Sequence, residues 1–98
     1  MYFVEFSSQA RKDKKLLKEA GLDKKAKFLL DVIAVNPFQS PPSFEKLHGD
    51  LSGSYSRRIN SQHRLVYDIV GNVENILSPD GTPYHGIIRV KRMWTHYE

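Results

Sequence analysis

A stretch rich in proline and glycine divides this sequence into two halves with different patterns. Residues 37–54 contain Pro37, Pro41, Pro42, Gly49 and Gly53. Regular structure does not continue through such a run, because proline lacks a backbone donor and glycine has no fixed conformation. Helical periodicity dominates before this stretch and strand-like segments follow it. The sequence therefore predicts an α+β fold with its helices in the first half.

The first half predicts a short strand at Tyr2–Phe6 and then two helices. Their natural boundaries are a cap at Ser7-Ser8, a glycine stop at Gly21, a second cap at Asp23 and an end at Asn36. The last boundary follows from Pro37, which disfavours helical geometry in the residue before it. Because the link between the helices is so short, we expect an antiparallel helical hairpin.

The second half predicts an antiparallel sheet, with strands at Tyr55–Ile59, His63–Val70, Val73–Leu77 and Gly86–Trp94. Turn signals stand at Gly71-Asn72 and Asp80-Gly81, and residues 78–86 are long enough for an extended hairpin tip. One pattern stays unexplained. Ile88, Val90, Arg92 and His96 are all an even number of residues apart, so a regular strand would put these apolar and polar side chains on the same face. With 98 residues, the chain is expected to form a single domain, 1–98.

Charge and composition point weakly towards a polyanionic partner. The net charge is +4, from 15 lysines and arginines against 11 acidic residues. Residues 1–50 hold eight lysines and one arginine, whereas residues 51–98 hold five arginines and one lysine. The planar guanidinium group of arginine can donate two parallel hydrogen bonds to phosphate oxygens. A phosphate-contacting surface is therefore expected in the second half.

Several classes of protein are disfavoured. There are no cysteines, which excludes disulfides and thiolate metal sites and fits a reducing cytoplasm. The start of the sequence lacks the features of a signal peptide, and no apolar run approaches the roughly 20 residues of a membrane span. No two of the histidines His48, His63, His85 and His96 have the spacing of a zinc site. We therefore expect a cytoplasmic protein without metal, cofactor or membrane contact.

Two arginines of the second half would lie opposite each other in a hairpin. If residues 60–62 form a three-residue loop, Ile59 faces His63 and Arg58 faces Arg64. The other face of the second strand then carries the apolar side chains Leu65, Tyr67 and Ile69. Opposed like charges destabilise a ladder by up to about 1 kcal/mol, unless an anion such as phosphate binds between them. The alternative is that each arginine pairs with a carboxylate or points into solvent, and the pattern leaves both open.

A longer motif surrounds this hairpin. It consists of Leu51-Ser52-Gly53, Ser56-Arg57-Arg58-Ile59 and His63-Arg64-Leu65-Val66-Tyr67 at fixed gaps, preceded by Phe44-Glu45-Lys46-Leu47 and followed at the end of the chain by His96-Tyr97. Pro37-Phe38 stands where the second helix would end. These residues resemble the signature of the YoeB/Txe toxins, strongly over residues 37–70 and again over 93–97.

The resemblance implies a RelE-like fold, with helices on one face of a twisted antiparallel sheet and the substrate on the other. It also implies a toxin of a toxin–antitoxin pair, which cleaves messenger RNA in the ribosomal A site without a metal. The implied partners are the mRNA on the ribosome, a cognate YefM/Axe-like antitoxin, a second copy of the chain as in related toxins, and operator DNA through the antitoxin complex only.

By match to the family motif, five residues take catalytic roles. Glu45 would be the general base that accepts the proton of the ribose 2′-hydroxyl, and His96 the general acid for the departing 5′-oxygen. Arg64 would stabilise the phosphate, Arg58 would support the same charge, and Tyr97 would position the substrate. The products would be a 2′,3′-cyclic (or 3′-) phosphate and a 5′-hydroxyl.

Three further residues, Lys46, His48 and Arg57, are candidates for RNA contact. Solvated loop residues look much the same as Lys46 and His48, and Arg57 also suits a structural role. The family often has an arginine and an aromatic residue before the terminal histidine. Here Trp94 and Thr95 occupy those places, so the cation beside the acid is either missing or supplied by Arg92.

Two other function classes stay open. A non-catalytic RNA- or DNA-binding module on the same scaffold would keep the arginines but would not depend on Glu45 or His96. An inactive relative that only titrates an antitoxin would bind its partner without affecting growth. The presence of Glu45, Arg64 and His96 together favours the ribonuclease.

Overall fold

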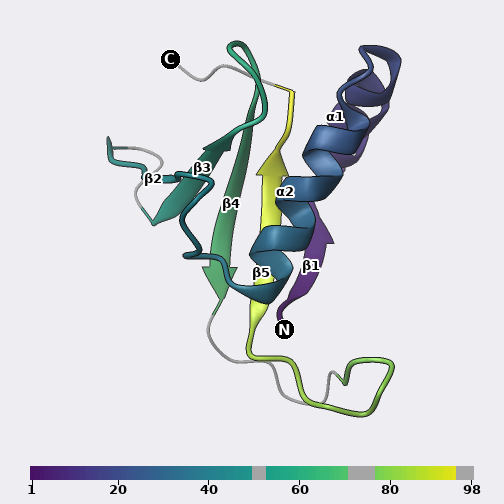
Figure 1. Cartoon of the computed structure of the whole chain (residues 1–98), viewed down its shortest axis with the longest axis vertical. Coiled ribbons are helices and arrows are strands. Elements are labelled where there is room, and N and C mark those ends of the chain that lie inside the picture. The colour runs from purple at the N-terminus through teal and green to yellow at the C-terminus, as the bar shows by residue number, and fades with distance from the viewer. Residues whose placement is uncertain (50–52, 71–76, 95–98) are drawn as a thin grey trace.

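The computed structural model describes residues 1–49, 53–70 and 77–94, which form two helices packed against a five-stranded sheet (Figure 1). The elements are β1 (Phe3–Phe6), α1 (Ser8–Glu19), α2 (Asp23–Val35), β2 (Glu45–Lys46), β3 (Ser54–Arg58), β4 (Arg64–Val70) and β5 (Ile87–Arg92). This arrangement confirms the predicted α+β class. Of the strand expected at Val73–Leu77, only Leu77 falls within the described residues.

The sheet has the strand order β1-β5-β4-β3-β2. Strands β2 to β5 pair antiparallel, as the sequence predicts. Strand β1 instead runs parallel to β5, with Phe3 opposite Ile87 and Phe6 opposite Val90. A parallel pair requires a long connection, and nearly the whole chain lies between these two strands. The sheet is therefore mixed, with the N-terminal strand at its edge.

The helix boundaries follow local chemistry. The Ser7 hydroxyl accepts the Ala10 backbone N–H at 3.0 Å and caps α1. Helix α2 ends at Val35, with Asn36 as its C-cap, directly before Pro37. Asp23 is not the cap of α2, because Leu22 occupies that position. Asp23 is the first helical residue, where its negative charge favours the positive end of the helix dipole.

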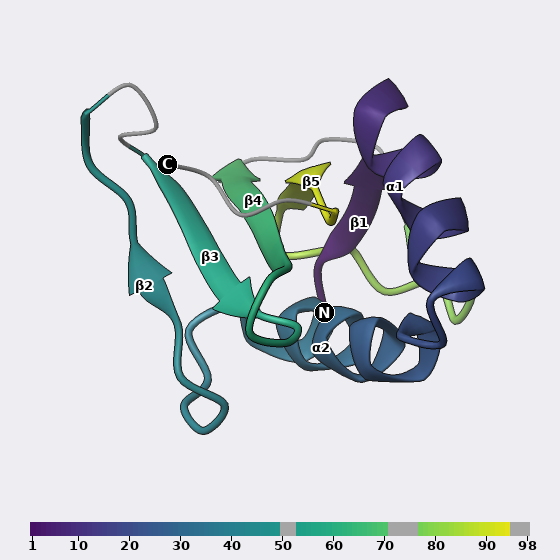
Figure 2. The ribbon, with the colours of Figure 1, turned by 90° about the horizontal axis from the view of Figure 1, so that it is seen from above.

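Both helices lie to one side of the sheet. The chain runs up through α1 and back through α2 in Figure 1, and Figure 2 shows α2 beneath the sheet and α1 beside the β1 edge. The core joins them through Ala10, Leu17, Ala26, Leu29, Ile33, Ile59, Leu65, Tyr67, Ile88, Val90 and Met93. No described helix covers the opposite face of the sheet. Neither described helix has the length and apolar character that a membrane span requires.

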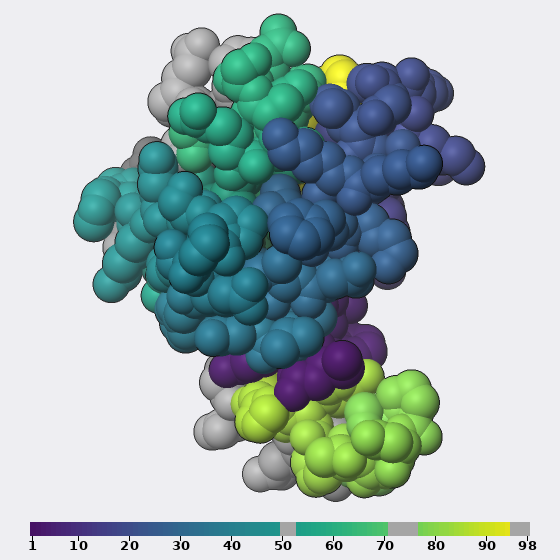
Figure 3. All heavy atoms as spheres, in the orientation of Figure 1, coloured from purple at the N-terminus to yellow at the C-terminus, as the bar shows by residue number. Residues whose placement is uncertain are grey.

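Residues 77–86 fold back on the N-terminus. Leu77 bridges to Pro83, and Gly81 turns the chain with φ +87°. The His85 backbone N–H donates to the Met1 carbonyl at 2.9 Å, and the rings of Phe3 and Tyr84 are 5.5 Å apart. Figure 3 shows this segment beside the N-terminal residues, as a projection at one end of the molecule. The segment thus forms a turn closed by the Leu77–Pro83 bridge and anchored to Met1, and the strand expected before it lies outside the described residues except for Leu77.

Candidate active site

The hairpin between β3 and β4 has the predicted register. Arg58 is paired with Arg64, and the Ile59 backbone N–H donates to the His63 carbonyl at 2.9 Å. The loop is closed by the Asn60 side chain, whose amide oxygen accepts the backbone N–H groups of Gln62 and His63 at 2.8 and 2.7 Å. The two arginines therefore occupy neighbouring positions on one face of the sheet.

The edge strand β2 brings Glu45 to the same face. Glu45 is paired with Ser56 across the ladder, and its Oε2 lies 3.5 Å from an Nη of Arg64. The same Arg64 nitrogen donates to the hydroxyl of Ser56 at 3.2 Å. Ser56 is fully buried, so it supports Arg64 from beneath. Three strands thus contribute one carboxylate and two guanidinium groups to one spot.

These groups line a cleft of about 210 Å³, together with Ser43, Phe44 and Ser56. The Glu45 side chain is 61% exposed and the Arg64 side chain is 21% exposed, so a ligand can reach both. Two guanidinium charges against one carboxylate leave the lining with a net positive charge. Such a cleft can hold a phosphate and place a base beside it. The described residues include no cluster of three side chains that could hold a metal ion.

The sequence left open that each arginine of the pair binds a carboxylate, and the structure shows such a contact for Arg64. Arg64 has Glu45 as a carboxylate partner, which offsets the like-charge repulsion that the register creates. This contact does not separate the structural interpretation from the catalytic one, since a general base and its neighbouring cation would make the same pair. What the structure adds is that the pair lies in an open cleft and is not sealed in the core.

Arg57 is not available to contact RNA, contrary to its assignment among the RNA-binding candidates. Strand alternation turns it to the face opposite Arg58, where it is 1% exposed. Its Nε donates to the Tyr67 hydroxyl at 3.1 Å, and its Nη atoms donate to the carbonyls of Pro42, Pro37 and Gln39 at 2.6, 3.0 and 2.8 Å. The structural role is therefore the correct one.

Lys46 and His48 are both exposed. Lys46 is paired with Tyr55, so strand alternation directs its side chain away from the face that carries Glu45. Its direction disfavours contact with a phosphate held between Glu45 and Arg64. His48 follows the end of β2, and its contact with RNA stays a prediction.

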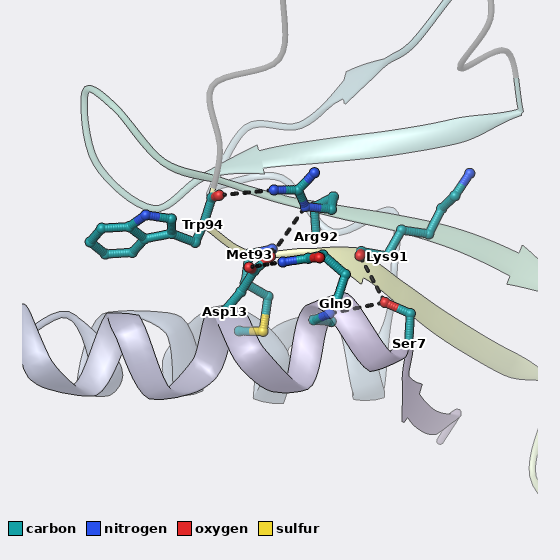
Figure 4. Close-up of polar contacts among 8 residues, drawn as sticks. Ser7, Gln9, Asp13, Lys91, Arg92, Met93 and Trp94 are labelled. Carbon is teal, nitrogen blue, oxygen red and sulfur yellow. Dashed lines mark hydrogen bonds and ion pairs between the residues drawn. The ribbon is translucent and has the colours of Figure 1, made fainter.

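The chain leaving β5 is anchored by Asp13, a fully buried residue of α1 that sequence reasoning missed (Figure 4). One carboxylate oxygen accepts the Met93 backbone N–H at 2.9 Å and lies 3.3 Å from Nε of Arg92. Gln9 donates to the other oxygen at 3.0 Å. Burial favours a raised pKa for Asp13, but these hydrogen bonds outweigh it and hold the pKa below 3.8. Arg92, the expected substitute cation, is thus paired with Asp13.

Trp94, the last described residue, packs against the hairpin between β3 and β4. Its ring stacks on His63 with centroids 3.9 Å apart, and His63 directly precedes Arg64. Nδ1 of His63 is buried and has no hydrogen-bond partner among the described residues. His96 and Tyr97 lie outside the described residues, so their roles stay predictions.

Comparisons with known proteins agree on one family. A family model described as "YoeB-like toxin of bacterial type II toxin-antitoxin system" matches residues 3–85. A toxin YoeB from Synechocystis is 51% identical over 57 residues, which are 58% of this chain and 59% of that protein. The sequence match thus spans less than two thirds of that relative.

Solved structures match over nearly the full length. A YoeB/ParE toxin from Agrobacterium tumefaciens superimposes with a TM-score of 0.78 at 24% identity, over 97% of this chain and 99% of that one. A YoeB dimer from Staphylococcus aureus gives 0.71 at 32% identity, over 98% of both chains. The heterotetrameric YoeB–YefM toxin–antitoxin complex from the same organism gives 0.69 at 31% identity, over 99% of both chains.

Proposed function

Because this chain belongs to the YoeB-like toxins of bacterial type II toxin–antitoxin systems, we propose that it is a metal-independent endoribonuclease that cleaves messenger RNA in the ribosomal A site. Its fold is the α+β, RelE-like arrangement of the YoeB and YafQ structures. The observation that carries the proposal is the contact of Glu45 with Arg64 at 3.5 Å, in an exposed cleft that also holds Arg58.

The proposed reaction is an attack by the ribose 2′-hydroxyl on the neighbouring phosphate. Glu45 accepts the hydroxyl proton, the new O–P bond forms, and the bond to the 5′-oxygen breaks. Arg64 and Arg58 stabilise the charge that develops on the phosphate oxygens. His96 gives the departing 5′-oxygen its proton, and Tyr97 positions the substrate. The ribosome supplies the orientation of the RNA, which reduces what the small cleft must contribute.

We propose that a cognate antitoxin binds and neutralises the protein, and the existence of a YoeB–YefM toxin–antitoxin complex from Staphylococcus aureus supports such a partner. Covering the cleft would block access of RNA to Glu45 and Arg64. A homodimer is proposed from the dimeric structure of the same relative. Contact with operator DNA would occur only through the antitoxin complex.

The first test is brief expression of the wild type and of Glu45→Gln in bacterial cells, followed by mapping of new 5′-hydroxyl ends on mRNA. We expect wild-type cuts at a fixed codon position in translated regions. Glu45→Gln should reduce them roughly a hundredfold, because general base catalysis contributes about 10²- to 10⁴-fold. Glu5→Gln is the matched control, since Glu5 also pairs with an arginine, Arg89 at 2.7 Å, but lies outside the cleft.

Each result has a defined meaning. Growth arrest without new ends would contradict the ribonuclease and favour a nucleic-acid-binding module. New ends that are unchanged in Glu45→Gln would contradict the catalytic assignment of Glu45. Absence of both arrest and new ends, with tight binding of antitoxin, would favour the antitoxin-titrating relative. Loss of cuts in Glu5→Gln as well would show that the effect is not specific to the cleft.

A further inference from the structure

The loop that leads into Glu45 has few regular hydrogen bonds of its own. Residues 36–44 connect α2 to β2, which is only two residues long and lies at the edge of the sheet. The hydrogen bonds within the loop are local, such as Phe38 N–H to the Asn36 side chain at 3.0 Å and Gln39 N–H to the Asn36 carbonyl at 3.1 Å. Such contacts shape the turn but do not place it against the sheet.

Arg57 makes that connection through hydrogen bonds, beside the ring contacts of Tyr55 in β3 with Phe38 and Phe44 at 5.5 and 6.0 Å. Its buried guanidinium donates to three carbonyls spread along the loop, those of Pro37, Gln39 and Pro42. The ring of Phe44, the residue before Glu45, lies 5.0 Å from the guanidinium carbon of Arg57. The loop is therefore held at its start, its middle and its end by one side chain of β3.

Tyr67 completes the arrangement from β4. Its hydroxyl accepts from Nε of Arg57 and donates to the Pro37 carbonyl at 3.0 Å. Burial raises the pKa of Tyr67 above its ordinary 10.0, although the hydrogen bond from Arg57 opposes this, so the hydroxyl keeps the proton that it donates. Side chains of two neighbouring strands, β3 and β4, thus donate hydrogen bonds to the same loop.

The position of Arg57 in β3 links these loop contacts to the cleft. Ser56 and Arg58, its neighbours in β3, point to the opposite face and line the cleft. Leu65, its partner in β4, directly follows Arg64. We propose that Arg57 is a positioning residue that sets Glu45 against Arg64, a role that rests on the proposed ribonuclease function. A buried cation bound mainly to neutral carbonyls is costly, and this role accounts for its presence.

The test is single-turnover cleavage of mRNA on programmed ribosomes by purified Arg57→Met and Arg57→Lys. Methionine removes every donor, and lysine keeps the charge but has one nitrogen in place of the planar fork. We expect the maximal rate to fall about 10- to 100-fold in Arg57→Met, because misplacement by about 1 Å can cost that much. Arg57→Lys should be intermediate, and half-saturation by ribosomes should change by less than about threefold in both.

The second readout is the combination with Glu45→Gln. If Arg57 acts through Glu45, adding Arg57→Met to Glu45→Gln should cost less than about threefold more, because contacts that share one function are not additive. Leu29→Ala, a core change on α2, serves as the control of matched stability loss. It should leave the maximal rate near that of the wild type below its unfolding temperature. The proposal is overturned if the rate losses of Arg57→Met and Glu45→Gln multiply in the double variant. It is also overturned if Leu29→Ala loses as much rate as Arg57→Met.

Tyr67→Phe is the second variant, which tests the proposal if Arg57→Met does not fold. It removes one acceptor for Arg57 and one donor to the Pro37 carbonyl while it keeps the ring. A several-fold lower rate that does not add to Glu45→Gln would support the positioning role, and an unchanged rate would contradict it. The two proposals fail differently. If Glu45→Gln cleaves like the wild type, the ribonuclease assignment of Glu45 is wrong, whereas a fully active Arg57→Met beside an impaired Glu45→Gln removes only the positioning role.

Discussion

Replacing Arg64 with methionine should lower the rate of mRNA cleavage on programmed ribosomes by about 100- to 1,000-fold, the cost of removing one preorganised donor to a developing oxyanion. The effect should exceed that of Glu45→Gln for two reasons. Arg64 would stabilise the phosphate directly, and its contacts with Glu45 and the buried Ser56 also hold the base in place. Arg64→Lys should recover part of the rate, because it restores the charge without the planar fork.

Arg89→Met is the matched control for Arg64→Met. Arg89 also pairs with a glutamate, Glu5, but it lies where β5 meets β1, with β4 between it and β3. Its removal should leave the cleavage rate within about twofold of the wild type, because exposed ion pairs contribute little. A wild-type rate in Arg64→Met would show that the cleft is not the catalytic site. A large loss in Arg89→Met would mean that charge in general, and not the cleft, controls the reaction.

Asp13→Ala should lower the free energy of unfolding by about 2 kcal/mol, mainly because the Met93 backbone N–H loses its acceptor inside the protein. For a domain of this size the midpoint of thermal unfolding should fall by roughly 8–16 °C. Calorimetry on the purified protein measures both quantities. Asp31→Ala on α2 is the control, since Asp31 pairs with Lys27 in an exposed contact and its loss should cost less than about 0.5 kcal/mol.

The stability difference between wild type and Asp13→Ala should also depend on pH. The pKa of Asp13 is lower in the folded protein than its ordinary value of 3.8. The charged carboxylate therefore contributes stability that is fully present above that value and is lost as the pH falls through the folded pKa. Urea unfolding at pH 7 and near pH 3 should show the difference shrinking at the lower pH. Asp80, whose pKa the Ser78 and Thr82 hydrogen bonds lower to about 2, is in both proteins and cancels.

An Asp13→Ala protein as stable as the wild type would show that the Met93 N–H finds another partner. A stability difference that grows on acidification would contradict the direction of the Asp13 pKa. Either result would also weaken the interpretation that α1 anchors the chain leading from β5 towards His96.

Much of the fold could be predicted because the deciding signals are local. Ser7 caps a helix through its own hydroxyl, and Pro37 ends one through its ring, whatever lies around them. The register of the β3–β4 hairpin follows from the length of its loop, so the opposition of Arg58 and Arg64 was predictable. The family motif named Glu45, but the sequence placed it in the proline- and glycine-rich stretch, and its pairing with Ser56 in the edge strand β2 came only from the structure.

Other features depend on contacts between distant residues. The parity of β5 changes at a β-bulge, where Tyr67 pairs with Val90 but Val66 pairs with Arg92. Lys91 is the extra residue, and its carbonyl accepts from the Ser7 hydroxyl at 2.8 Å. Val90 and Met93 are consequently buried while Arg92 is exposed. Strict alternation in the sequence had given no account of this, because a bulge breaks the period of two.

The sequence by itself determined the class of fold, the helix boundaries to within one residue, and the hairpin that opposes Arg58 and Arg64. Only the tertiary structure decided that Arg57 is buried under the loop and bound to the carbonyls of Pro37, Gln39 and Pro42, since these partners lie far from it along the chain. It also decided that Asp13, one charge in a lysine-rich helix, is a buried anchor for β5. Local periodicity sets the direction of a side chain, but its partners come from segments far along the chain.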